Sequence, residues 1–172
     1  MNRVTILAAA IASALLVAAP AQLLAATPAT ESSGSAIVLK PLSLIRKTNM
    51  DFGTLIASAT AGTATIDPVT GTLTTTGGVT PVPGGVSPGV FLGAGSRNAP
   101  YQIRLPKNPI TLTRTGGTET MTVSNWTLDG PTNRKIGANE AFSFNVGARL
   151  AVAANQRDGT YVGTFDVTVH YP

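Results

Sequence analysis

The chain has 172 residues, of which 43% are apolar and 12% are charged, and its formal net charge is +4. This composition is too apolar for an intrinsically disordered protein and, once a leader is subtracted, fits a single domain. The absence of cysteine excludes disulfides, thiolate metal sites and thiol nucleophiles, and a single histidine leaves little basis for a histidine metal site.

The N-terminus has the pattern of a secretory signal peptide. Arg3 supplies the positive charge, and the uncharged run Val4–Ala19 that follows it has 16 residues, short of the roughly 20 apolar residues that a membrane-spanning helix needs. Small residues at Ala19 and Ala21 favour cleavage after Ala21, with cleavage as late as Ala26 as the alternative. We therefore expect residues 1–21 to be a helical signal peptide. The mature protein is then exported, passes through the periplasm to the cell surface or medium, and keeps no transmembrane anchor.

The remaining charges do not form a nucleic-acid surface. Without Arg3, eleven basic side chains face eight acidic ones, a net charge of +3. The longest basic runs are the pairs Arg46-Lys47 and Arg134-Lys135, and aromatic residues are not interleaved with them. The sequence therefore lacks the basic cluster and the reading motif of a nucleic-acid binder.

The first part of the mature chain predicts an extension followed by strands. Residues 22–35 (QLLAATPATESSGS) are expected to be a flexible extension ahead of a single domain over residues 36–172. Ile37 to Leu44 contains Pro41 and is predicted to be either an edge strand or a strand that breaks and switches sheets at this proline. A hairpin is predicted to join Gly62–Ile66 to Thr72–Thr76 across the turn residues between them, and its second strand is expected to stop at Thr76, before two glycines.

The middle of the chain predicts further short strands. Residues 77–95 are rich in proline and glycine and suit short strands, such as Gly89–Leu92, but no helix. Ala99–Leu105 alternates apolar and polar residues and should be half buried. Ile110–Thr113 and Glu119–Leu128 flank two glycines, which predicts a second hairpin.

The C-terminal third carries the strongest alternation. Apolar residues recur at every second position from Phe142 to Val152, with Gly147 predicted to be a bulge or a point of close approach. Gly159 to Tyr171 is predicted to be one long strand that bends at Gly163. Its apolar face is formed by Tyr161, Gly163, Phe165, Val167, Val169 and Tyr171.

These patterns together predict an all-β protein. After residue 26 the sequence shows no convincing helical period, and many short Thr-rich strands separated by turns favour an antiparallel β-sandwich, with a small barrel as the alternative. Because large aromatic side chains are few, the core is expected to consist mainly of Val, Ile, Leu and Thr.

Four segments of the chain resemble a known bacterial family. Residues 36–55 (AIVLKPLSLIRKTNMDFGTL), 62–71, 118–123 and 142–171 look like the family catalogued as domain of unknown function 4402. That family is similar in turn to the spore-coat-U and archaic chaperone-usher pilin subunits. Pilin subunits typically end with a penultimate Tyr and a Gly fourteen positions from the end, and those positions here hold Tyr171 and Gly159.

The resemblance implies a fold and a mode of assembly. It implies an incomplete, immunoglobulin-like β-sandwich whose open groove accepts a strand from a periplasmic chaperone and then from the next subunit, with an outer-membrane usher as a further partner. The implied assembly strand contains Gly159, Tyr161, Gly163, Phe165, Val167, Val169 and Tyr171. Residues 22–35 lie where a donated strand is expected but alternate poorly. At this point they remain either a weak donor or a disordered spacer.

The residues that suggest chemistry have simpler interpretations. Asp166 and His170 share one face of the last predicted strand, but a nucleophile motif that would complete a triad is missing from the sequence. Asp51 and Asp67 are expected to fix turns, and Trp126 to be a partly buried anchor. We therefore expect no enzymatic activity, cofactor or metal.

The sequence thus leads to two functional hypotheses. The first is an exported structural subunit of a bacterial surface fibre or coat that self-associates by strand pairing. The alternative is a monomeric envelope or secreted β-sandwich that binds or adheres to a ligand through its loops.

Overall fold

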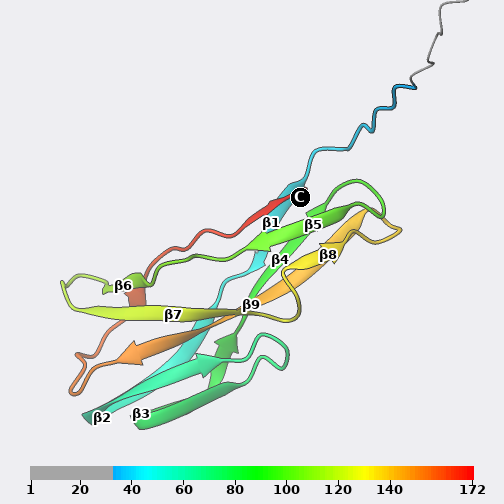
Figure 1. The fold of residues 1–172 in the computed structure, drawn as a ribbon. Coiled ribbons are helices and arrows are strands. Elements are labelled where there is room, and N and C mark those ends of the chain that lie inside the picture. Colours follow the sequence, from blue (N-terminus) through cyan, green and yellow to red (C-terminus); the bar gives the residue numbers. More distant parts are fainter. Residues whose placement is uncertain (1–32) are drawn as a thin grey trace, which may run out of the picture. The chain divides into compact units, whose positions relative to one another are not determined.

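A computed structural model describes residues 33–172, which contain strands and no helix (Figure 1). The predicted signal peptide and residues 22–32 lie outside the described residues, and residues 37–172 form one compact unit. Within the described residues there is no helix suited to crossing a membrane. The strands are β1 (Ser43–Thr48), β2 (Asp51–Ile66), β3 (Leu73–Ser87), β4 (Gly89–Ala94), β5 (Pro100–Arg104), β6 (Ile110–Arg114), β7 (Thr120–Leu128), β8 (Asn133–Lys135), β9 (Ala141–Val152), β10 (Tyr161–Val162) and β11 (Thr168–His170).

The strands pair in the order of an immunoglobulin-like sandwich. One sheet runs β1-β4-β9-β7 and continues through β6 to β10, and the other runs β11-β5-β8. In immunoglobulin nomenclature, the first sheet has the strand order A-B-E-D, formed by β1, β4, β9 and β7 in that order. Position C is divided between β5 and β6, and position F between β10 and β11. The β2–β3 hairpin is an insertion between positions A and B. The prediction of an antiparallel, all-β sandwich is confirmed.

Strand β9 organises the larger sheet. Along one edge it pairs first with β4 and then with β2, and along the other edge it pairs with β7. Its predicted alternation is confirmed, because every second side chain from Phe142 to Val152 is buried. Gly147 lies where β9 changes partner, and a Cβ atom there would clash with the Ile66 carbonyl oxygen. The predicted close approach at Gly147 is therefore confirmed.

The core differs in composition from the prediction. Four of the five phenylalanines are buried, and the buried core contains no threonine among the described residues. Six aromatic rings form a continuous row with neighbouring centroids 4.2 to 6.5 Å apart, which suits stacked and tilted aromatic contacts. The row runs in the order Tyr101, Phe142, Phe144, Phe91, Phe165, Trp126. Threonine instead occupies the solvent side of the strands, because its hydroxyl group is costly to bury.

Three predicted strand boundaries are wrong. The first strand of the predicted hairpin begins at Asp51 and not at Gly62. The first strand begins at Ser43 and not at Ile37, because the pairing partner β4 ends at Ala94, opposite Ser43. Strand β3 does not stop at Thr76 but continues to Ser87. Gly77, with a φ of 63°, absorbs the irregularity in the ladder, so the strand bends without ending.

The last predicted strand is broken into two short ladders. β10 pairs with β6 and β11 pairs with β5, while residues 163–167 between them have no ladder partner. These five residues face the eight residues 105–112, so the registers cannot match. Pro106 and Pro109 in the facing stretch also lack the amide that a ladder requires.

Tyr101 is expected to make folding sensitive to alkaline pH. Burial raises the pKa of its phenol above 10.0, and this effect outweighs the opposing influence of the nearby Arg134 guanidinium. Below pH 10 the Tyr101 phenol is protonated in both the folded and the unfolded state. The free energy of unfolding should therefore decline only as the pH rises above about 10, where the unfolded state loses this proton first. Urea unfolding of Tyr101→Phe across this range should show a shallower decline than the parent protein. Equal slopes would contradict the assignment.

Candidate functional site

A groove of about 1100 Å³ lies beside the C-terminal segment, defined here as residues 156–171. One wall is formed by residues 49–57, which include the start of β2, and the other by residues 156–167. Its lining between the walls is apolar and consists of Phe91, Ile110, Leu112, Met121, Val123, Leu150 and Val152. The charged side chains that line the groove have both signs: Arg46, Asp51, Arg157, Asp158 and Asp166.

Both walls present strand edges without a partner. Residues 62–65 of β2 pair with β3 on one edge and with β9 on the other, but residues 51–57 pair only with β3. The C-terminal segment pairs through one edge with β5 and β6, and no described strand pairs with its other edge. Unpaired backbone amides and carbonyls on both sides of an apolar floor are what an added β-strand requires.

Tyr161 identifies the strand that borders the groove. Its hydroxyl group donates to the carbonyl oxygen of Arg157 at 2.7 Å and accepts from the Gln156 Nε2 atom at 2.7 Å. A tyrosine bonded to the backbone a few residues upstream marks the start of strand F in immunoglobulin domains. The groove therefore lies next to F, where strand G belongs in a complete sandwich, and no strand of residues 33–172 fills it.

The structure divides the predicted assembly strand into two parts. Gly159, Tyr161, Gly163, Phe165 and Val167 line the groove. Val169 and Tyr171 lie beyond it and pack against the core cluster around Phe144. Phe165 connects the groove to the core, because its ring lies 4.7 Å from Trp126 and 6.3 Å from Phe91. Trp126 is half-buried, as the sequence predicts.

The other candidate residues have structural roles. Asp67 accepts a hydrogen bond from the Val69 amide at 2.7 Å and fixes a turn, as predicted. Asp51 does not precede the strand in a turn. It is the first residue of β2 and accepts from the Gly53 amide at 2.8 Å, across the bulge between Phe52 and Thr54. Asp166 is exposed and His170 is half-buried in β11, and no hydrogen bond joins them. Between residues 33 and 172, no group of three or more acidic, histidine or cysteine residues is arranged to hold a metal.

Sequence comparison adds one finding to this geometry. A family model described as "Domain of unknown function (DUF4402)" matches residues 42–171, which include all eleven strands and both walls of the groove. No curated protein and no solved structure matches the chain.

Proposed function

We propose that this chain, which belongs to the DUF4402 family, is an exported structural subunit of a bacterial surface fibre or coat whose copies join by strand pairing in the groove. The observation that carries the proposal is the unfilled place of strand G, with an unpaired strand edge on each wall and an apolar floor between them. A strand that enters this space gains backbone hydrogen bonds on both sides and buries alternate side chains. The proposal assigns the protein no catalytic role.

Export with an open groove requires a temporary partner. Unpaired strand edges promote aggregation, and here two of them flank an apolar floor whose Ile110, Leu112 and Met121 are only half-buried. The proposal therefore includes a periplasmic chaperone that supplies a strand during export and an outer-membrane usher that receives the subunit. The resemblance of the C-terminal segment to pilins, with Tyr171 penultimate and Gly159 fourteen positions from the end, supports the same mode of assembly.

Replacement of Met121 by Asp tests the groove directly. Met121 lines the floor, and a charge there would be buried under an inserted strand at a cost of several kcal/mol. We expect self-association to weaken by at least about 100-fold, as measured by sedimentation velocity and electron microscopy.

The matched control is Thr122→Asp, one residue along β7 and exposed on the opposite face. This variant should assemble like the parent protein. A parent protein that stays monomeric at every concentration would reject the proposal and favour a monomeric binding module, and so would equal assembly of the Met121→Asp variant.

A further inference from the structure

Ile37, Val38 and Leu39 form an exposed apolar run just ahead of β1. Their exposed fractions are 88%, 93% and 42%, and no other consecutive large apolar residues are exposed among residues 33–172. None of the three belongs to a strand or to either core cluster. Three adjacent apolar side chains in water are costly and indicate a surface that is covered in the functional state.

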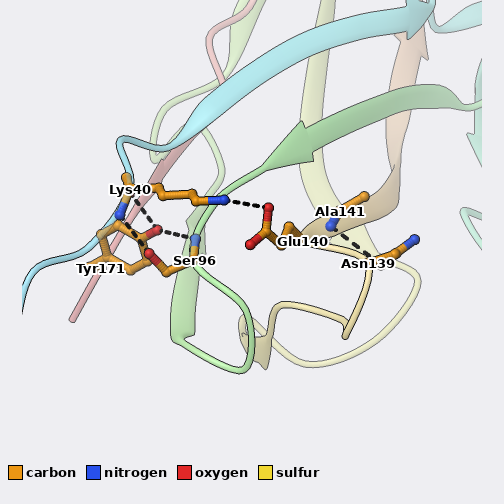
Figure 2. Close-up of polar contacts among 6 residues, drawn as sticks. All are labelled: Lys40, Ser96, Asn139, Glu140, Ala141 and Tyr171. Carbon is orange, nitrogen blue, oxygen red and sulfur yellow. Dashed lines mark hydrogen bonds and ion pairs between the residues drawn. The ribbon is translucent and has the colours of Figure 1, made fainter.

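Lys40, the next residue, is fixed by a set of hydrogen bonds (Figure 2). Its amide donates to the Ser96 Oγ atom at 2.6 Å, and its carbonyl oxygen accepts from the Tyr171 hydroxyl group at 2.8 Å. The same hydroxyl group accepts from the Ser96 amide at 2.8 Å, and the Lys40 Nζ atom lies 2.6 Å from Glu140 Oε2. The C-terminal end of the apolar run is therefore fixed beside Tyr171.

This attachment keeps the run away from the floor of its own groove. Ile37 lies at most about 11 Å from Lys40 along the chain. The floor residues Leu112 and Met121 are paired across β6 and β7. They lie close to Val162, because Val162 pairs with Thr113, the residue after Leu112 in β6. Val162 is nine residues before Tyr171, about 30 Å along an extended chain. The run can therefore reach the end of the floor formed by Leu112 and Met121 only in another molecule.

We propose that Ile37 and Leu39 are the apolar anchors of the strand that one copy of this chain inserts into the groove of a second copy. In an extended segment these two side chains point to the same face, and Val38 points to the other. The donated run and the groove are different surfaces, so the contact is head-to-tail and builds an open chain of subunits. This inference rests on the proposed function and places the donor at residues 37–39. These residues follow residues 22–35, which the sequence leaves as either a weak donor or a spacer.

The test compares two variants of the full chain. In Ile37→Asp/Leu39→Asp, both anchors carry charges that the apolar floor cannot accept. We expect this variant to self-associate at least about 100-fold more weakly than the parent protein. Val38→Asp is the control, because its charge would face away from the floor, and it should assemble within about threefold of the parent. Since these side chains are exposed in the monomer, all variants should unfold at the same temperature.

A mixing experiment separates this inference from the proposed function. The double variant keeps its groove and Met121→Asp keeps its donor, so an equimolar mixture should form 1:1 pairs that grow no further. If the double variant alone assembles like the parent while Met121→Asp does not, the groove accepts a strand but the donor lies elsewhere, and the inference is wrong. Loss of assembly in Val38→Asp alone would also overturn the assignment of faces.

Discussion

A chain whose groove is filled by a covalently attached strand is expected to be a stable monomer. The change is a second copy of residues 22–40, attached after Pro172 through a Gly/Ser linker of about five residues. The copy would turn back from the C-terminus and run antiparallel to the C-terminal segment, in the place of strand G. With its groove closed, no molecule can accept a neighbour's strand, so fibre growth should be lost completely.

The attached strand should also raise the unfolding temperature. Burial of two large aliphatic anchors contributes about 3 to 6 kcal/mol, and each new backbone hydrogen bond adds about 0.5 to 1.5 kcal/mol. Ordering of the added residues offsets part of this gain, at about 1 to 2 kcal/mol per residue. A net gain of about 3 kcal/mol would raise the midpoint by about 10 °C for a domain of this size.

Calorimetry and sedimentation of two fusions measure this effect. The control fusion carries Ile37→Asp and Leu39→Asp in the attached copy only, so its length and linker are unchanged. It should unfold at the temperature of the parent monomer and should still accept a strand. If both fusions unfold at the same temperature, the groove does not select an apolar strand.

The sequence predicts the sheet well where burial is local. Alternation from Phe142 to Val152 reports one buried face directly, and β9 begins one residue earlier and ends where predicted. The turn at Asp67–Gly71 is equally local, because an Asp side chain and a Gly are sufficient to reverse the chain.

The sequence does not separate a donated strand from a strand of the domain. Ile37–Leu39 has the apolar, β-branched composition of a buried strand, yet it lies in water. β-propensity indicates only that a segment is extended, and it does not identify the surface that covers the segment. In the further inference above, the surface that covers Ile37–Leu39 belongs to another molecule. The strand predicted over Ile37–Leu44 therefore joins two different segments: the exposed residues Ile37–Leu39 and the first residues of β1.

The sequence identifies one wall of the groove and misses the other. The pattern from Tyr161 to Val167 alternates beside a glycine bend, so that wall is visible in the sequence. The wall at residues 51–57 depends on the point where β2 leaves β9, a strand about 90 residues away in the chain. No local signal in the sequence carries that pairing, because only residues 62–65 of the 16-residue strand β2 contact β9.

Replacement of Phe144 by Ala is expected to cause the largest loss of stability of any single substitution proposed for this protein. Phe144 is fully buried, and its ring stacks on Phe91 at a centroid distance of 5.3 Å. Removal of a buried phenyl ring leaves a cavity that the two sheets cannot fill, at a cost of about 3 to 5 kcal/mol.

Urea unfolding should show this loss as a lower midpoint with an unchanged slope. Val162→Ala, at an exposed position, is the control and should change stability by less than about 0.5 kcal/mol. Because Phe91 also contacts Phe165 in the groove wall, loss of its stacking partner should loosen that wall, and strand acceptance should weaken in the folded fraction as well. A Phe144→Ala protein with parental stability would show that the aromatic row does not hold the two sheets together.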